Sequence, residues 1–397
     1  MKSKYKLLSE GKVRFWGPDL ELYRAPSGVE PSWAPVFYNP AMKLNRDISV
    51  AALQAYCDLY RRGVAVCEPL SATGVRGLRY AAEVDGVDTV YLNDLNEEAY
   101  RLIKLNVEAN GLEERARVSK LDANVLLAIH ARGGARFDVV DIDPFGSPVP
   151  FLDNAIRALK HGGMLCATAT DLAPLFGVHK RACIRKYGAI PLRVRFSREI
   201  GTRILLGYIA RTAAKYSIGV LPLLSFYARH YIRAAVLVLK GRKHADLSID
   251  KLGYVLYCRK CGYRRLVEFS EVLSAELNCE SCGARVEVAG PLWIGEIAER
   301  EFAERAYEAY KRLGYLDPRG ERILELVVQE CGKPPLYYST EEIAVLYRVE
   351  EPPVRELVDV LARLGYDCSL THFDPKGFRA DATAREIAKI AEGLRRL

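Results

Sequence analysis

The stretch Phe137-Asp138-Val139-Val140-Asp141-Ile142-Asp143-Pro144-Phe145-Gly146-Ser147-Pro148 decides the fold that we expect. A short apolar run that ends in an acid, followed by proline, an aromatic residue and glycine, is typical of a buried parallel strand entering a rigid loop. In open α/β sheets, ligands bind at the carboxyl ends of the strands. The loop offers the carboxylate of Asp143, the carbonyl of Pro144 and the flat ring of Phe145. These groups suit a planar base whose ring stacks on Phe145 while its exocyclic amine donates to Asp143 and Pro144.

Guanine fits this carboxylate better than the other amino bases do. Its Watson–Crick edge presents two adjacent donors, N1–H and the N2 amine, whereas adenine and cytosine place an acceptor beside their amine. An ionised Asp143 can accept from both guanine donors. The alternative interpretation is that Asp143 is a strand-end acid that only caps the helix expected to begin near Val149.

Helices and strands alternate through the part of the chain around this loop. The pattern predicts helices over 47–62, 75–83, 96–109, 123–131 and 151–159, and strands over 64–67, 89–92, 116–119, 137–141 and 164–168. Such alternation predicts a doubly wound α/β domain, in which helices cover both faces of a mostly parallel sheet. Two further strands, 217–227 and 231–240, are expected to close the sheet as a hairpin with one antiparallel strand.

The loops that follow the first three predicted strands favour an adenosine ligand without phosphates. The first loop, 68–77, lacks the G-x-G-x-x-G spacing of a dinucleotide site, yet its small residues let the backbone approach a nucleoside. Asp94 follows the second strand, where a carboxylate can accept from both ribose hydroxyls. Asp122 and Ala123 follow the third, where they can meet an adenine amine and ring. Together they indicate S-adenosylmethionine, although each acid alone could be a helix N-cap.

Two C-x-x-C-G segments predict a zinc site. They are Cys258-Arg259-Lys260-Cys261-Gly262 and Cys279-Glu280-Ser281-Cys282-Gly283, with 17 residues between the pairs. Four thiolates suit tetrahedral zinc and leave no open coordination position, so the metal is expected to be structural. The alternative is a pair of disulfides. Cys331 and Cys368 could also pair, but spacing does not decide this.

The charge distribution favours a polyanionic partner. The chain of 397 residues has a net charge of +8, and from His179 to Lys215 it carries ten lysines and arginines against one acid, Glu199. That footprint suits a nucleic-acid backbone, with a plain solvated basic face as the alternative. Three methionines and two glutamines suggest a thermophile. No apolar run approaches the ~20 residues that span a bilayer, so we expect a cytoplasmic protein without membrane contact.

Several motifs together resemble one family of enzymes. The stretch Asp143–Pro148 looks like the catalytic motif of amino-group methyltransferases that use S-adenosylmethionine. With Phe37-Tyr38-Asn39-Pro40, Asn45-Arg46-Asp47, residues 70–77 and Thr168-Ala169-Thr170-Asp171, it is similar to the tRNA guanine-26 N2-dimethyltransferases. The matches extend from about Phe37 to Thr371-His372-Phe373, nearly the whole chain.

The resemblance implies a class I methyltransferase fold, tRNA as the partner and two methyl transfers to guanine 26. It implies two groups of site residues: Asp143, Pro144, Phe145 and Phe37 around the base, and Arg46, Arg76, Asp94, Asp122 and Ala123 around the cofactor. The alternatives are an amino-methyltransferase of rRNA or DNA, and a non-catalytic RNA-binding protein with a vestigial methyltransferase fold.

We expect four segments along the chain. Residues 1–46 form an N-terminal apron, 47–243 the methyltransferase domain, 244–290 a zinc ribbon and 291–397 a helical, winged-helix-like module that binds RNA. A packing or dimerisation role for the last module is the alternative. Residues 241–243 are expected to be a charged linker, and 339–343 resemble a capping box. No obligate protein partner is implied.

Overall fold

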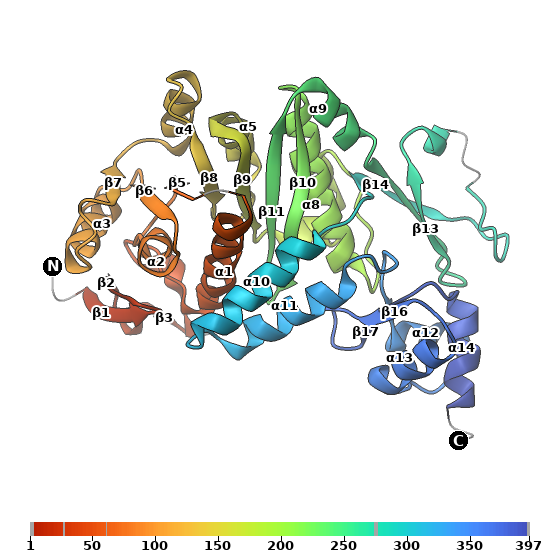
Figure 1. Cartoon of the computed structure of the whole chain (residues 1–397). Coiled ribbons are helices and arrows are strands. Elements are labelled where there is room, and N and C mark those ends of the chain that lie inside the picture. Colours follow the sequence, from red (N-terminus) through yellow and green to blue (C-terminus); the bar gives the residue numbers. More distant parts are fainter. Residues whose placement is uncertain (1–3, 27, 61, 274–276, 395–397) are drawn as a thin grey trace. The chain divides into compact units, whose positions relative to one another are not determined.

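The computed structural model describes residues 4–26, 28–60, 62–273 and 277–394, and it confirms the α/β class (Figure 1). The chain divides into two compact units. Unit 1 comprises Met1–Thr168, Ala235–Val238 and Glu301–Leu324, and unit 2 comprises Ala169–Ala234, Leu239–Arg300 and Glu325–Leu397. The units therefore do not coincide with the four predicted segments, because the chain passes between them several times.

A seven-stranded sheet has the order β10-β11-β9-β8-β5-β6-β7. Its five parallel strands lie in the order β7-β6-β5-β8-β9. The chain adds β5, β6 and β7 toward one edge and then β8 and β9 toward the other, so the order of strands reverses between β5 and β8. This reversal is the topological switch point at which doubly wound sheets bind ligands. Only two residues connect β10 to β11, so these neighbours run antiparallel, as predicted. The bounds are β5 (Val64–Glu68), β6 (Val87–Asn93), β7 (Ala116–Ser119), β8 (Phe137–Ile142), β9 (Leu159–Ala169), β10 (Ile218–Ala228) and β11 (Tyr231–Lys240).

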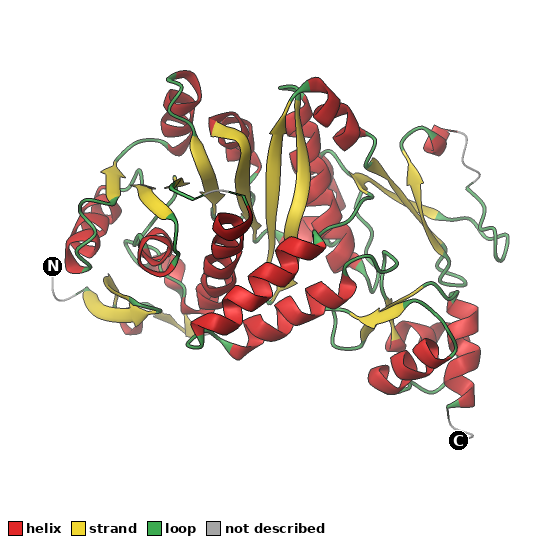
Figure 2. Cartoon of the chain, viewed as in Figure 1, coloured by secondary structure: helices red, strands yellow, loops and turns green. Residues whose placement is uncertain are grey.

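The helices between these strands form where the apolar periodicity predicts them, as Figure 2 shows in red. The first helix begins four residues earlier than predicted, because Asn39 caps a short 3-10 turn that leads directly into it. The bounds are α1 (Lys43–Leu59), α2 (Val75–Glu83), α3 (Glu97–Ala109), α4 (Ala123–Arg132) and α5 (Val149–Ala158).

The N-terminal part of unit 1 consists of short strands and turns. Hairpin β1–β2 turns at Gly11 and is followed by the two-residue strands β3 and β4. The bounds are β1 (Tyr5–Glu10), β2 (Val13–Pro18), η1 (Leu20–Leu22), β3 (Arg24–Ala25), β4 (Gly28–Val29), η2 (Pro31–Trp33) and η3 (Pro40–Met42).

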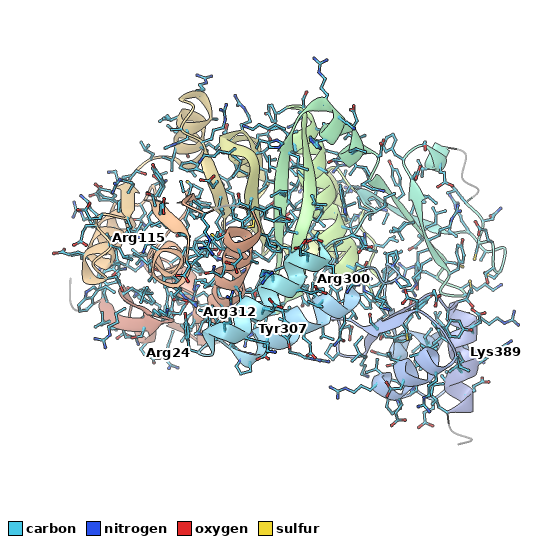
Figure 3. The ribbon with its side chains drawn as sticks, in the orientation of Figure 1. Arg24, Arg115, Arg300, Tyr307, Arg312 and Lys389 are labelled. Atoms are coloured by element: carbon cyan, nitrogen blue, oxygen red, sulfur yellow. The ribbon has the colours of Figure 1, made fainter. Side chains whose placement is uncertain are left out.

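Unit 1 also includes most of two helices from the predicted C-terminal module, α10 (Arg300–Leu313) and α11 (Pro318–Glu330). The buried ring of Phe302 packs on Tyr60 of the segment that follows α1, at 6.5 Å between centroids. Arg312, labelled in Figure 3, pairs with Asp58 at 3.1 Å. The predicted boundary at residue 291 therefore does not separate the two units.

Unit 2 contains the remaining elements, and one of them corrects a prediction. Residues 242 and 243 are not a linker, because Arg242–Ile249 form helix α9, whose Ser248 hydroxyl accepts from the Val220 amide of β10. The other bounds are α6 (Leu172–Leu175), α7 (Lys180–Tyr187), α8 (Ser197–Ala214), β12 (Leu252–Tyr257), β13 (Arg264–Glu268), η4 (Glu271–Leu273) and β14 (Glu287–Trp293).

The C-terminal part of unit 2 has the predicted mixture of helices around a small sheet. Three antiparallel strands in the order β15-β17-β16 pack with three helices around a core that includes Leu357, Leu361 and Phe378. The bounds are β15 (Tyr338–Ser339), α12 (Thr340–Tyr347), α13 (Val354–Arg363), β16 (Cys368–Leu370), β17 (Gly377–Ala380) and α14 (Ala384–Gly393).

The capping box predicted at 339–343 is wrong. Ser339 makes no side-chain cap, and Glu342 instead accepts from the Arg264 guanidinium at 2.6 Å and the Tyr257 hydroxyl at 2.9 Å. The capping box lies at the start of α14, where Thr383 and Glu386 bond reciprocally. The local pattern assigns the Glu342 carboxylate to the start of the helix, but this carboxylate bonds instead to Arg264, which is distant in the sequence.

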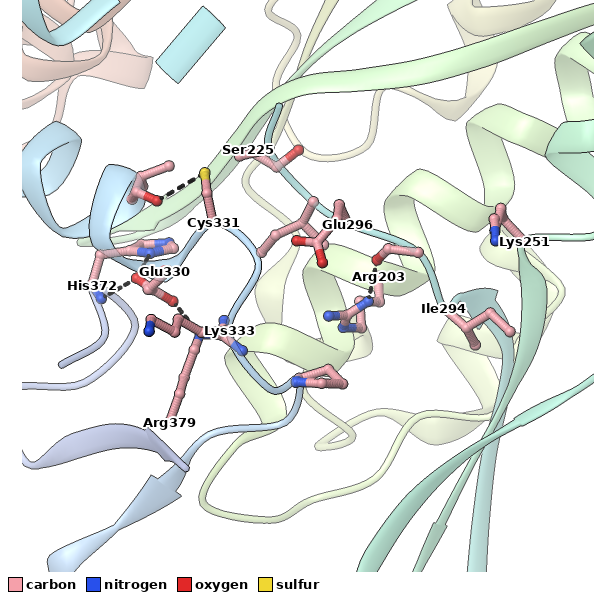
Figure 4. A pocket seen from close by; sticks show the side chains of 15 residues that line it. Arg203, Ser225, Lys251, Ile294, Glu296, Glu330, Cys331, Lys333, His372 and Arg379 are labelled. Carbon is pink, nitrogen blue, oxygen red and sulfur yellow. Dashed lines mark hydrogen bonds and ion pairs between the residues drawn. The ribbon is translucent and has the colours of Figure 1, made fainter. Parts of the chain in front are cut away.

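Unit 2 contains a cavity of about 320 Å³ that is lined in part by a buried ion network (Figure 4). Glu330 accepts from Arg379 at 2.7 Å and from His372 Nδ1 at 2.6 Å, and Glu199 pairs with both Arg203 and Arg379. Burial would raise the pKa of both glutamates, yet their cationic neighbours outweigh burial and lower each pKa to about 2. The network joins α8 and α11 to β17.

Candidate active site

The loop after β8 has the composition that a base site needs. Asp141 is buried at the end of the strand, where it accepts from the Tyr80 hydroxyl at 2.6 Å. Two residues further on, the Asp143 side chain is 19% exposed and the Phe145 ring is 69% exposed. Gly146 has a φ of +77°, a conformation that an L side chain rarely adopts, and this turns the chain back toward α5. The loop therefore presents a carboxylate and an aromatic face to solvent.

Arg76 on α2 holds the Asp143 carboxylate. Its Nη2 pairs with Asp143 Oδ2, while its Nη1 donates to Asn45 Oδ1 at 2.9 Å and to Ser49 Oγ at 3.0 Å. Asp143 does not cap α5, whose N-cap is Pro148 without a side-chain bond. The helix-capping interpretation of Asp143 is thus wrong, and the acid is oriented by a buried cation 67 positions away.

Glu68 completes a cluster of three acids around Arg76. Its Oε1 lies 3.5 Å from Arg76 Nε, and Asp141 lies 3.7 Å from Arg76 Nη1. Burial raises the pKa of Glu68 to about 8, with Arg76 only partly opposing the rise. Glu68 is therefore largely protonated at neutral pH. The positive charge of Arg76 is then balanced by the carboxylates of Asp141 and Asp143.

The two predicted walls of the base pocket meet in the structure. The rings of Phe37 and Phe145 are 4.4 Å apart between centroids and cross at 73°. A base stacked between two rings needs them about 7 Å apart, twice an optimal carbon–carbon contact. The two phenylalanines are therefore neighbours, and they must separate before a base can lie between them.

The predicted cofactor acids lie at the ends of adjacent strands. Asp94, after β6, accepts from the Ala72 amide at 2.8 Å and the Asn96 amide at 2.9 Å. Asp122, after β7, is the N-cap of α4, and Ala123 is buried beside it. Asp122 therefore caps the helix, which was the alternative considered for it, and it does so through one oxygen, Oδ1.

Asn93 organises these strand-end loops, and sequence reasoning missed its role. Its amide donates to the carbonyls of Pro69 at 3.0 Å and Leu121 at 2.9 Å, and its Oδ1 accepts from the Leu121 amide. It is fully buried. A polar amide at the end of an otherwise apolar strand was the available signal. By tying the first and third loops to the second, Asn93 fixes the spacing of the groups that follow.

Arg46 lies on α1, at the edge of the apron. It pairs bidentately with Glu10 at 2.7 and 2.6 Å and lies over the Tyr38 ring. Burial would raise the pKa of Glu10, but Arg46 and Arg79 outweigh burial and lower it to about 2. The N-terminal hairpin is thus tied to α1 and α2 by buried charge.

The four cysteines of the two knuckles come together in unit 2. Their sulfur atoms lie within 4.8 Å of one another, with 3.5 Å between Cys258 and Cys282 and between Cys261 and Cys279. Zinc with bonds of about 2.3 Å places tetrahedral thiolates about 3.8 Å apart, so the cluster fits zinc. All four cysteines are free, which excludes the alternative of two disulfides here. Cys331 and Cys368 are also free.

Both knuckles have the same backbone geometry. The amides of Gly262 and Gly283 donate to the carbonyls of Cys258 and Cys279 at 2.9 and 2.8 Å, and each glycine has a φ of +69°. Glycine is needed because an L side chain rarely adopts this conformation. The two loops therefore present their sulfurs symmetrically.

The basic stretch is only partly a surface feature. Arg203 is buried against Glu199, and Arg211 donates to the Tyr187 carbonyl at 2.6 Å. Four of the exposed cations have no acidic partner within the described ranges: Lys180, Arg181, Arg185 and Arg193. These four keep the predicted capacity for phosphate.

Comparison with known proteins identifies the family. Residues 13–392 match the family model described as N2,N2-dimethylguanosine tRNA methyltransferase. The chain belongs to this family. It is 42% identical to the tRNA (guanine(26)-N(2))-dimethyltransferase of Methanosarcina acetivorans, over 92% of this chain and 93% of that one. The enzyme of the same name from Methanothermobacter thermautotrophicus is 37% identical over 98% of both chains.

A solved relative supports the fold and the cofactor of this methyltransferase family member. The structure of Trm1 from Pyrococcus horikoshii in complex with S-adenosyl-L-methionine matches with a TM-score of 0.82 and 35% identity. The match covers 97% of this chain and 99% of that one. Within the described ranges, none of the helices combines the length and the apolar character that a membrane span requires.

Proposed function

We propose that this enzyme transfers methyl groups from S-adenosylmethionine to the N2 amine of guanine 26 in tRNA, giving N2-methylguanosine and then N2,N2-dimethylguanosine. The observation that carries this proposal is the Asp143 carboxylate, held by Arg76 beside the exposed Phe145 ring at the end of β8. The full-length relatives bear the name of this reaction, which favours tRNA over rRNA or DNA as the substrate. A tRNA-modifying role also favours the cytoplasm.

The chemistry requires that the guanine amine become a nucleophile. Its lone pair is delocalised into the ring, so the nitrogen must be rehybridised before it attacks. Asp143 Oδ2 is held by Arg76, while Oδ1 has no partner among the described residues and is available to the base. In the proposal Asp143 accepts N1–H and one N2–H, and the Pro144 carbonyl accepts the other N2–H. These bonds direct the lone pair away from the loop.

Methyl transfer then needs a donor in line with that lone pair. When bound, S-adenosylmethionine supplies a methyl group on a positively charged sulfur. The nitrogen forms a bond to this methyl as the sulfur–carbon bond breaks, and the amine proton released passes to Asp143. Phe37 and Phe145 would separate and stack on the two faces of the flipped base.

The cofactor would be held at the strand ends beside the switch point. Asp94 would accept from the ribose hydroxyls, and Asp122 and Ala123 would meet the adenine. Arg46 and Arg76 complete the proposed set. The close packing of Gly77 supports this placement, because a Cβ there would meet the Leu92 side chain at 2.3 Å and Glu68 at 3.1 Å. That packing brings α2 close to the loop that would face the nucleoside.

The test is methyl transfer to tRNA transcripts with guanine or adenine at position 26. We expect wild type to form dimethylguanosine on the guanine transcript alone, and Asp143→Asn to lose about 10²- to 10⁴-fold in rate, the range of general acid–base contributions. The matched control is Asp88→Asn, which changes an exposed acid on β6 and should leave the rate unchanged. Equal methylation of both transcripts would reject guanine 26, and undiminished activity of Asp143→Asn would reject the mechanism.

A further inference from the structure

An open groove of about 490 Å³ in unit 2 lies where three sequence segments meet. One wall is the loop from Arg193 to Arg195, at the centre of the basic stretch. The second is Tyr257 with Arg259, which lies inside the first cysteine knuckle. The third is α12, which contributes Glu342, Val345 and Leu346. The groove therefore combines the basic stretch, the cysteine cluster and the C-terminal helices, none of which the proposed chemistry uses.

The floor of the groove carries no uncompensated negative charge. Glu342 is its one acid, and it is buried against Arg264 at 2.6 Å and the Tyr257 hydroxyl at 2.9 Å. Arg264 is itself buried, with its guanidinium 4.2 Å from the ring centroids of Phe196 and Tyr338. This packing fixes the floor, so an anion that enters the groove meets arginines and no free carboxylate.

The arginines at the rim are available to an anion. Arg193 is exposed and has no acidic partner within the described ranges. Arg195 and Arg259 are 51% and 55% exposed at their side chains, and pair with Glu341 at 2.7 Å and Glu287 at 2.9 Å. Such exposed pairs contribute ~0–1 kcal/mol and are screened by salt. A chain of phosphates can replace these acids at little cost.

The first cysteine knuckle fixes the position of Arg259. Arg259 lies between Cys258 and Cys261, and its Nη2 also donates to the Arg193 carbonyl at 3.3 Å. A metal held by the four sulfurs would lock the backbone on both sides of Arg259. Lys260, the next residue, is exposed and adds a further cation without an acidic partner in the described part of the chain.

We propose that this groove binds the sugar–phosphate backbone of the RNA substrate, with Arg193, Arg195 and Arg259 on successive phosphates. The planar guanidinium matches a phosphate bidentately, which suits arginines better than lysines to this role. Val345, 70% exposed at the edge of the groove, offers an apolar contact to a ribose or base. The inference rests on the proposed function, since it assigns the cysteine cluster the task of holding part of the tRNA-binding surface.

The test compares tRNA binding by wild type, Arg193→Gln, Arg259→Gln and the triple variant with Arg195→Gln, at several salt concentrations. Each single change is expected to weaken binding about 3- to 10-fold and to lower the slope of log K against log salt by about one. Arg101→Gln is the matched control, because Arg101 is exposed and pairs with Glu97 at 2.8 Å on α3. It should bind tRNA as wild type does.

Two further measurements separate the possible failures. The affinity for S-adenosylmethionine and the thermal midpoint should be unchanged in all variants, because the arginines are exposed and lie outside the proposed catalytic loop. If wild type methylates tRNA while the triple variant keeps both its affinity and its salt slope, the groove proposal is overturned and the proposed function stands. If wild type neither binds nor methylates tRNA, the proposed function fails first. If the triple variant loses the binding of a polyglutamate probe that wild type binds, but still binds tRNA, the groove would belong to an acidic protein and the proposal would be overturned.

Discussion

At the residue scale, Arg76 is the most heavily connected side chain of the candidate site. It is buried among Glu68, Asp141 and Asp143 and bonds to Asn45 and Ser49. We expect Arg76→Met to destabilise the protein by about 3–5 kcal/mol, because removing one partner of a buried ion pair leaves uncompensated charge. Chemical denaturation measures this, with the exposed Arg101→Met as the control. A loss below ~1 kcal/mol would contradict the picture of Arg76 as the counter-ion of the cluster.

Substitution of Glu68 is expected to stabilise the protein, in contrast to substitution of Arg76. Its pKa is raised from 4.5 to about 8, so the folded state resists an ionisation that the unfolded chain undergoes. The stability cost is absent below pH 4.5, grows as the pH rises and levels off above about 8. We expect Glu68→Gln to be more stable than wild type at pH 8, by at most the ~5 kcal/mol that the shift converts to, because glutamine does not ionise. The two proteins should converge at pH 4; a constant difference across this range would contradict the prediction.

At the scale of elements, the cysteine cluster predicts metal-dependent stability. We expect about one zinc per chain by elemental analysis, and a lower thermal midpoint when a chelator removes it, since the four sulfurs lie together within the small core that joins the two knuckles. Cys279→Ser should abolish the zinc content. Cys368→Ser, at a free and partly buried cysteine outside the cluster, is the control and should keep the metal. Zinc-free protein with an unchanged midpoint in chelator would refute a structural metal.

The elements of the sheet were the most predictable part of the chain. The predicted bounds of α2, β7 and β11 agree with the structure at every residue, because apolar periodicity distinguishes strands from helices. The same alternation placed Asp94, Asp122 and Asp143 at the carboxyl ends of their strands. What it could not place was the partner of each acid. Arg76 is 67 positions from Asp143, and only the crossover of the sheet brings them together.

Local patterns failed where distant residues compete for the same group. Residues 339–343 have the letters of a capping box, yet Glu342 is taken by Arg264, 78 positions earlier. Residues 241–243 have the composition of a charged linker, but Arg242–Ile249 form a helix in which Ala245 and Ser248 are buried.

At the scale of the whole molecule, each of the two units contains a buried ion network. Glu10 anchors one in unit 1, and Glu199 and Glu330 anchor another in unit 2. Replacing a buried ion pair with apolar residues is often neutral, yet removing one partner alone is costly. Networks of charges also lose less of their stabilisation at high temperature than isolated pairs do. The arrangement fits the thermophile that the composition suggests.

These networks predict how the protein responds to acid. Each of the three glutamates has its pKa lowered from 4.5 to about 2, so its contribution is complete above pH 4.5 and is lost as the pH falls toward 2. Each shift of this size converts to at most ~3.4 kcal/mol. Because unit 2 holds two such acids and unit 1 holds one, we expect unit 2 to lose more stability between pH 4.5 and 2.5. Hydrogen exchange resolved by peptide would measure each unit separately. In Glu330→Gln, unit 2 should be less stable at pH 7 but should change less with pH, and a slope equal to that of wild type would show that Glu330 is not ionised in the fold.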